Sequence, residues 1–183
     1  MSDYYSDDTG ILLNQKTNTT LSDARFEKVS FEQFASGFPD TTSRDYIHLV
    51  YDGIRLPRRA TENSAGYDFY LPYAICLGSG YAMTIPTGIR VYMNSGWFLM
   101  CVPRSGLGFK YGVHLRNTCG IIDSDYVSAE NEGHIMASLT SEVPLSMMAG
   151  DRFMQGIFVP FGVTVDDSPI RQQRTGGMGS TGG

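Results

Sequence analysis

Short hydrophobic runs alternate with polar and glycine-rich stretches along most of this 183-residue chain. From Arg25 onward the runs are rich in β-branched and aromatic residues, and Gly, Pro, Asn and Asp separate them. The runs are RFEKVSF, IHLVYDGIRL, YAMTIPTGIRVYM, WFLMCVP, GVHLRNTCGIID, HIMASL and RFMQGIFVPF. Many short strands joined by tight turns are typical of all-β proteins, so the pattern predicts a β-barrel or a β-sandwich.

Two of the runs predict where their strands lie. In GIRVYM, Ile89, Val91 and Met93 alternate with Arg90 and Tyr92, which is the period of a half-buried strand. The run WFLMCV is apolar on both faces, so it predicts a central strand. A helix of one or two turns is expected only in FEQFASGF.

The two ends of the chain differ in composition from its middle. Residues 1–24 are polar and lack periodicity, which predicts a flexible or irregular N-terminal extension. Residues 25–166 are expected to form one β domain, whose last strand ends near Val165. Residues 167–183 end in RTGGMGSTGG, which cannot bury a core, so they predict a mobile C-terminal arm.

Charge and cysteine content narrow the classes of function. The net charge is −5 without a block of like charges, which argues against nucleic-acid and membrane partners because both need a basic field. A small anionic substrate needs only a local cluster of arginines and backbone N–H groups. Cys76, Cys101 and Cys119 form no disulfide framework or metal pair, and Cys101 and Cys119 are expected in the core. No signal or membrane segment is evident, so a soluble, cytoplasmic protein is expected.

Five stretches depart from what a β fold alone requires. They are SAGYDFYLP, PRSGLGFKYG, CGIIDSDYV, GDRFMQGIFVP and the tail. Singly, each can be a turn or a strand end. In this order they closely resemble the five motifs of the trimeric dUTPase family, over Ala65 to Gly182. AGYD, PRSGLG, GIIDSDY, GDRFMQ and RTGGMGSTG correspond to the first to fifth motif.

The resemblance implies a fold, an assembly and a reaction. The fold would be a jelly-roll-like β-barrel of the β-clip type. The chain would form a homotrimer whose shared active sites combine motifs from different copies. The expected reaction is hydrolysis of dUTP to dUMP and pyrophosphate by water attack on the α-phosphate, which lowers dUTP and supplies dUMP for dTMP synthesis. Mg²⁺ is the implied cofactor, and the substrate phosphates would hold most of it.

The third motif would supply the base and the nucleoside pocket. The resemblance implies that Asp123 is the general base, whereas Asp125 is interpreted as a turn residue. The ring of Tyr126 would lie against the deoxyribose and leave no room for a 2′-hydroxyl. Asn117 would help to read the uracil edge within the hairpin that also carries Ile122, a further substrate-binding residue. As an alternative, Asn117 only forms the turn.

The first, second and fourth motifs would hold the triphosphate. Arg104, Ser105 and Gly106 resemble the family's phosphate-binding triplet, since guanidinium and hydroxyl groups suit phosphate oxygens and glycine lets the backbone approach. Gln155 would donate to the same phosphates. Asp68 would lie near Mg²⁺ and hold a metal-bound water. The scattered histidines show no metal spacing and are expected to be structural or solvated.

The fifth motif would close the pocket, and it departs from the family in two ways. The residues expected to cover the substrate are Met178, Gly179, Ser180 and Thr181. Met178 stands where the family usually has a phenylalanine that stacks on the uracil, so weaker nucleotide capture is expected. The motif is also one residue short before its glycine pair. Arg174 is the implied γ-phosphate partner, with Arg171 as the alternative.

A third departure is an insertion. Six residues, VSAENE, separate Tyr126 from Gly133, where the family normally has one residue. The insertion is interpreted either as a tolerated surface loop or as a segment whose Glu130 and Glu132 reshape the pocket rim or offer a surface to another protein. Two other functions remain open: a dCTP deaminase, which shares the fold and the trimer, and a dUTPase-fold regulatory module that binds proteins.

Overall fold

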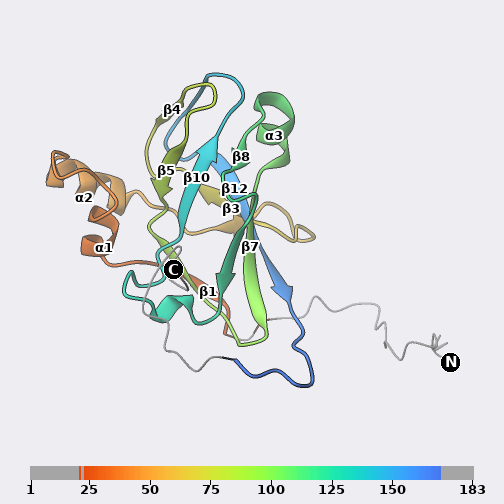
Figure 1. Cartoon of the computed structure of the whole chain (residues 1–183). Helices are drawn as coiled ribbons and strands as arrows, with labels where there is room; N and C mark the ends of the chain where they lie inside the picture. Colours follow the sequence, from red (N-terminus) through yellow and green to blue (C-terminus); the bar gives the residue numbers. More distant parts are fainter. Residues whose placement is uncertain (1–20, 22, 170–183) are drawn as a thin grey trace.

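The computed structural model describes residues 21 and 23–169 of the chain (Figure 1). Its helices are α1 (Phe31–Ala35), α2 (Arg44–Asp52) and α3 (Ser105–Tyr111), with a 3₁₀ turn, η1 (Tyr126–Ser128). The first strands are β1 (Arg25–Lys28), β2 (Arg58–Arg59), β3 (Tyr67–Tyr70), β4 (Ile75–Leu77), β5 (Met83–Pro86) and β6 (Ile89–Tyr92). The later strands are β7 (Trp97–Pro103), β8 (His114–Leu115), β9 (Gly120–Asp123), β10 (Met136–Thr140), β11 (Leu145–Met147) and β12 (Arg152–Pro160).

In the described part of the chain, the strands form four separate antiparallel sheets. The largest has the order β2-β3-β12-β7-β9, and the others are β5-β10-β8, β1-β6 and β11-β4. The predicted mostly-β class is therefore confirmed, but the described residues do not form the predicted closed barrel. Closure needs every strand to pair on both sides. Here β2 and β9 are edges of the largest sheet, and within the described residues β1, β4, β6 and β11 each pair with one neighbour.

The strand predictions with clear periodicity are confirmed. β7 pairs with β12 on one side and β9 on the other, so WFLMCVP is a central strand as predicted. In β6 and the residue after it, Ile89, Val91 and Met93 are buried, as the alternation predicts. The helix expected in FEQFASGF is α1. β12 ends at Pro160, so the expectation of a strand reaching Val165 is wrong.

The prediction of a strand in IHLVYDGIRL is also wrong, because most of this run lies in α2. Ile47 and Val50 of α2 lie three residues apart and are buried, which is the spacing of one helix face, and Ile54 just after the helix is buried as well. Leu49 lies off this face and is 72% exposed. The second motif likewise continues into a helix, α3, that strand periodicity did not predict.

The two N-terminal helices belong to the same core as the strands. Phe34 of α1 is fully buried, and its ring packs against Tyr51 of α2 at 5.7 Å between centroids. α1 and α2 lie together on one side of the molecule, away from α3 (Figure 1). Residues 25–160 thus share one hydrophobic cluster. The predicted boundaries at residues 24 and 166 stay predictions.

The three cysteines occupy different environments. Cys101 in β7 is buried, and burial raises the pKa of its thiol to about 12. Cys76 is exposed. Cys119 is only partly buried, so its predicted place in the core is wrong. None of the helices described is long and apolar enough to cross a membrane.

Candidate active site

A buried carboxylate joins three of the predicted motifs. Asp68 in β3 is 5% exposed and lies opposite Gln155 of β12. Its Oδ1 is 3.0 Å from Nε of Arg104, which follows β7, and its Oδ2 is 3.1 Å from a terminal nitrogen of Arg152. The structure therefore brings together Asp68, Arg104 and Gln155, which lie far apart in the sequence, and adds Arg152.

The backbone explains why these residues meet. Gly66 precedes β3, and a Cβ at this position would collide with the side-chain oxygen of Gln155. The N–H of Arg104 donates to the carbonyl of Phe153 at 3.2 Å, which ties the end of β7 to the start of β12. The glycine of AGYD therefore serves the close packing of two motifs, and the turn after β7 aims Arg104 at Asp68.

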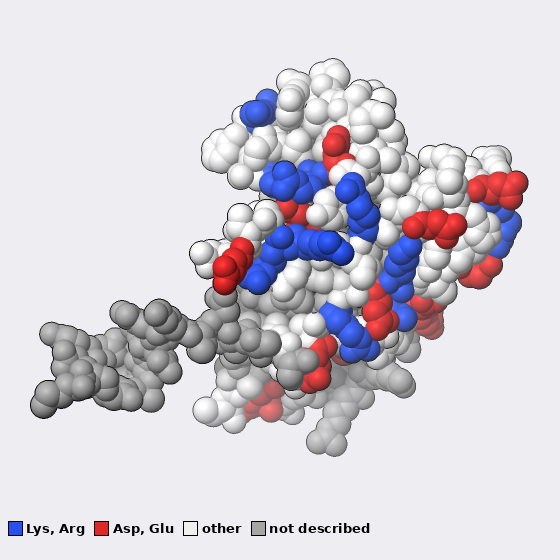
Figure 2. Space-filling view, turned by 180° about the vertical axis from the view of Figure 1, so that it is seen from behind, with Lys and Arg blue, Asp and Glu red and all other residues white. Residues whose placement is uncertain are grey.

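The site carries a local positive charge although the chain is acidic. Arg104 and Arg152 outnumber the single carboxylate between them, and Arg58 of β2 lies opposite Asp68 in the next strand. Figure 2 shows basic side chains gathered on one face with acidic side chains among them. Such a cluster attracts a small anion without a basic surface as a whole.

Ser105 and Gly106 begin α3 and are exposed. The first turn of a helix leaves its N–H groups without helical acceptors. The N–H groups of Leu107 and Gly108 donate to the carbonyl of Arg104, which closes the turn. A Cβ at Gly106 would meet open space, so a ligand can approach this backbone closely. These are the properties that a phosphate group needs.

Asp123 lies at the far end of β7 from this cluster. It ends β9, is exposed, and pairs with Phe98 near the start of β7, while Ile122 pairs with Leu99. Arg104 comes after the other end of β7. A strand rises about 3.3 Å per residue, so the two Cα atoms are about 20 Å apart. In Figure 1, α3 and the short teal helix that follows β9 lie at opposite ends of the molecule.

Asn117 is exposed in the tight turn that follows β8, within the four residues that separate β8 from β9. Leu115 and Thr118 bridge across this turn, and Thr118 has a left-handed φ of 67°. This position is compatible with both interpretations of Asn117, a turn former and a reader of a base. Asp125 lies in the turn before η1, and its carbonyl accepts from the N–H of Ser128 at 3.0 Å. Its predicted turn role is confirmed.

Tyr126 in η1 is 4% exposed in the isolated chain. Its hydroxyl donates to the carbonyl of His134 at 3.2 Å and accepts from the side-chain amide of Asn131 at 2.7 Å. The residue is thus almost wholly enclosed in the isolated chain, and its hydroxyl end is held by two hydrogen bonds.

Comparison with known proteins shows where these motifs belong. The dUTPase family model matches residues 52–182. The chain belongs to the dUTPase family. The deoxyuridine 5′-triphosphate nucleotidohydrolase of Lactococcus lactis is 41% identical over 135 residues, which are 71% of this chain and 89% of the relative. Among the enzymes considered from sequence, this selects dUTPase over dCTP deaminase.

Solved dUTPase structures resemble the fold. The dUTPase of Streptococcus mutans is 32% identical, with a TM-score of 0.58 over 76% of this chain and 97% of that one. A dUTPase from phage phi11 of S. aureus, whose structure concerns the coordination of a structural Mg(II) ion, covers 66% of this chain with a TM-score of 0.54. At 17% identity this second likeness shows the fold alone.

Sequence reasoning missed several residues around this dUTPase site. Arg152 stands inside the motif GDRFMQ, so the signal that could have found it was a basic residue within a predicted phosphate-binding motif. Its contact with the buried Asp68 is visible only in the structure. Asn131 lies in the insertion, and no sequence pattern predicts its contact with Tyr126. Glu132 was named from the sequence as a candidate for the pocket rim or a partner surface, but its contact with Ser30 was not predicted. Glu130 is exposed, but Ala129 is buried, so the insertion is more than a surface loop.

Other predictions concern metals, histidines and the tail. Within the described residues there is no group of three His, Cys, Asp or Glu that could hold a metal ion. His134 is buried, His48 stacks on Phe31 at 3.6 Å between centroids, and His114 contacts Thr140. The predicted tail residues lie outside the described part of the chain: Arg171, Arg174, Met178, Gly179, Ser180 and Thr181.

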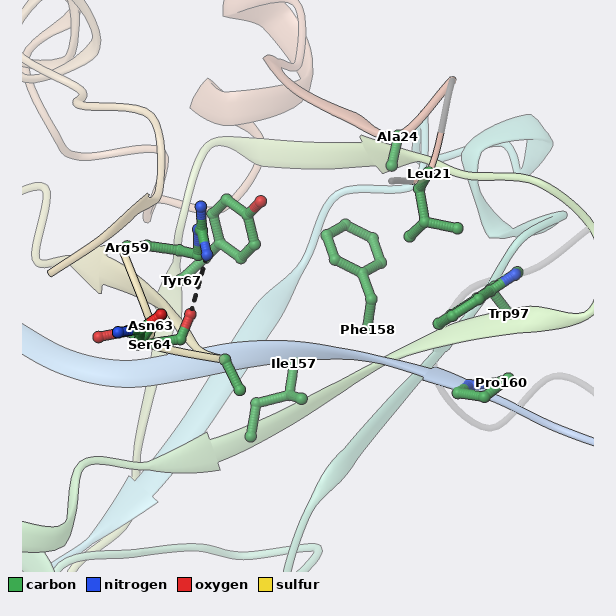
Figure 3. Close-up of a pocket in the computed structure, with 11 residues that line it drawn as sticks. Leu21, Ala24, Arg59, Asn63, Ser64, Tyr67, Trp97, Ile157, Phe158 and Pro160 are labelled. Carbon is green, nitrogen blue, oxygen red and sulfur yellow. Dashed lines mark hydrogen bonds between the residues drawn. The ribbon is translucent and has the colours of Figure 1, made fainter. Parts of the chain in front are cut away.

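A cavity of about 540 Å³ lies apart from the predicted site. Arg59, Asn63, Ser64 and Tyr67 lie at one end, and Leu21, Trp97 and Pro160 lie at the other (Figure 3). Arg59 donates to the carbonyl of Ser64 at 3.4 Å. Among the predicted site residues that the structure describes, none lines this cavity, although it adjoins the AGYD motif through Ala65.

Proposed function

We propose that this chain hydrolyses dUTP to dUMP and pyrophosphate. Membership of the dUTPase family supports this reaction. The observation that carries it is the cluster in which Arg104 and Gln155 meet around Asp68, since it combines three separate motifs in one positively charged site. A triphosphate is the anion that this arrangement suits.

Asp123 acts as the general base. Its carboxylate takes a proton from a water molecule, whose oxygen forms a bond to the α-phosphorus while the bond to the bridging oxygen breaks and pyrophosphate leaves. Positioned acid–base groups contribute about 10²–10⁴-fold to such reactions. The exposed position of Asp123 at the end of β9 supports this role, because water and substrate can both reach it.

The phosphates are held by donors from two motifs and by Mg²⁺. Arg104 supplies a guanidinium, Ser105 and Gly106 supply hydroxyl and N–H groups, and Gln155 supplies an amide. Asp68 is buried with both oxygens engaged by arginines, which fits a contact to Mg²⁺ through water better than direct ligation. Bound Mg²⁺ would neutralise the charge of the triphosphate.

The nucleoside is selected by the third motif. The hairpin turn at Asn117 offers backbone and side-chain groups to the uracil edge, and Ile122 of the following strand, β9, contributes to the same pocket. The ring of Tyr126 rejects a 2′-hydroxyl by steric exclusion, and the hydrogen bonds at its hydroxyl support this role because they hold the ring in one place.

The active site is shared between copies of the chain in a homotrimer. The base Asp123 and the phosphate-binding Arg104 lie at opposite ends of β7, about 20 Å apart along the strand. A triphosphate is too short to bridge this distance. A second copy that brings its own Asp123 to the Arg104 cluster completes the site.

Release of pyrophosphate from dUTP by the purified chain with Mg²⁺ tests this function. The parent chain should release pyrophosphate, and Asp123→Asn should lose at least about 100-fold in kcat because it lacks the base. The matched control is Asp125→Asn, two residues on, which should retain activity. Ammonia released from dCTP, or equal turnover by Asp123→Asn, would refute the proposal.

A further inference from the structure

The six-residue insertion turns back onto the side chain of Tyr126. Asn131 makes two contacts: its amide nitrogen donates to the hydroxyl of Tyr126 at 2.7 Å, and its amide oxygen accepts from the N–H of Gly133 at 3.2 Å. A Cβ at Gly133 would lie 2.6 Å from the Cα of Val127, so the loop closes tightly here. The amide of Asn131 is therefore held in place by its own turn.

The next residue anchors the insertion to the N-terminal helices. Glu132 has a φ of 56°, a left-handed conformation that non-glycine residues rarely adopt. Its carboxylate accepts from the N–H of Ser30 at 2.8 Å and from the hydroxyl of the same residue, and lies 3.5 Å from Arg90. These bonds offset the cost of the conformation.

His134 forms a second anchor beside the same loop. Its Nε2 accepts from the N–H of Gly88 at 2.9 Å, and its Nδ1 lies 3.5 Å from the side-chain amide of Gln33 in α1. Its carbonyl accepts from Tyr126. Ser30 and Gln33 precede residue 52, so the support of this ring begins outside the segment matched by the family model.

We propose that Asn131 is a positioning residue that determines sugar specificity. It acts through Tyr126: by fixing the phenol oxygen against His134, it keeps the ring from moving aside for a 2′-hydroxyl. This inference rests on the proposed function, in which the ring rejects ribonucleotides. Steric exclusion of one oxygen atom fails once the ring can tilt, so the hydrogen bonds at its far end set the selectivity.

The ratio of kcat/KM for dUTP to kcat/KM for UTP tests this inference. Asn131→Leu keeps the number and branching of the side-chain heavy atoms and removes the donor, and it should lower the ratio about fivefold, the value of one neutral hydrogen bond. Asn131→Asp keeps an oxygen for Gly133, and its second oxygen can accept the phenol proton in place of the His134 carbonyl. The phenol therefore stays tied to the insertion, and the ratio should stay within about twofold of the parent ratio. Overall destabilisation of the protein lowers kcat/KM for both substrates alike and leaves their ratio unchanged.

A double-mutant cycle assigns the effect to the phenol. Tyr126→Phe should lower the ratio as Asn131→Leu does, and adding Asn131→Leu to Tyr126→Phe should change it no further. Arg44→Ala, which breaks an exposed ion pair on α2, is the control and should keep the parent ratio. If Asn131→Leu does not fold, Tyr126→Phe alone decides.

The outcomes separate this inference from the function on which it rests. A parent chain that does not hydrolyse dUTP overturns both. A parent chain that hydrolyses dUTP, with the ratio unchanged in Asn131→Leu or in Tyr126→Phe, overturns only the positioning role. An equal loss from Asn131→Leu in the presence and absence of the Tyr126 hydroxyl also overturns it.

Discussion

Asp68 is the single carboxylate that holds two arginines of the candidate site in place. It is buried between two arginines, and each of its oxygens holds one guanidinium. Arg104 and Arg152 are themselves partly exposed, so they can return to water when the carboxylate is lost. The residue therefore matters more for the position of Arg104 than for the stability of the whole chain.

Asp68→Asn should lower kcat/KM for dUTP by about 100-fold, because a neutral amide no longer fixes Arg104 toward the phosphates. The free energy of unfolding should fall by about 1–3 kcal/mol. Steady-state kinetics and urea unfolding measure the two effects. Asp151→Asn, an exposed carboxylate in the GDRFMQ motif next to Arg152, is the control, and it should keep near-parent kinetics. A parent-like kcat/KM in Asp68→Asn would contradict this account of the cluster.

His134 gives the stability of the chain a pH dependence. Burial lowers the pKa of its imidazole to about 4, against an ordinary value of about 6.5 in the unfolded chain. Between these values the unfolded chain binds the extra proton, so stability rises with pH. The contribution is fully present above about pH 6.5 and is lost as the pH falls toward 4.

His134→Gln should therefore flatten the fall in unfolding free energy between pH 6.5 and 4, by up to about 3 kcal/mol. Urea unfolding at a series of pH values measures this slope. The test compares the unfolding free energy at pH 6.5 with that at pH 4 within each protein, so a change in the stability of the variant at pH 7 does not affect it. An identical slope in both proteins would show that His134 does not contribute.

At the residue scale, the motifs predicted the members of the site better than their contacts. Asp68, Arg104 and Gln155 were identified from the sequence, and the structure brings them together. The contact of Asn131 with Tyr126 was not predictable, because it depends on how the insertion turns, and an insertion has no periodic pattern.

At the scale of elements, α1 and α2 show that the β preference of individual residues does not by itself decide between strand and helix. The apolar residues of α2 follow a helix period, yet the run resembled a strand because Ile, Val and Tyr favour β structure. α1 is only five residues long, and its stability comes from Phe34 in the core and from Ser30 at its start.

Ser30→Ala should lower the free energy of unfolding by about 1–2 kcal/mol. Its hydroxyl accepts from the N–H of Gln33 at 3.1 Å as the N-cap of α1 and also donates to Glu132. Ser43→Ala is the matched control, because Ser43 precedes α2 without a side-chain capping bond. Thermal or urea unfolding compares the two. Equal losses in both variants would contradict the anchoring of the insertion on α1.

At the scale of the whole molecule, the sequence predicted the class of fold but not its closure. Strand period identifies which runs are strands, and β7 was correctly predicted to be central. Whether the sheets close depends on pairings between distant strands, which the period does not specify. The same limit applies to the separation of Asp123 from Arg104, because it follows from the register of β9 against β7.

The most direct test of the account mixes two inactive variants. Asp123→Asn lacks the base and Arg104→Ala lacks the phosphate ligand, so each should be inactive in pyrophosphate release from dUTP. Co-refolding equal amounts should restore activity at about a quarter of the sites, since random assembly pairs an intact base with an intact arginine from another copy at that frequency. A mixture of folded, assembled variants that stays as inactive as either alone would contradict a dUTPase site shared between copies.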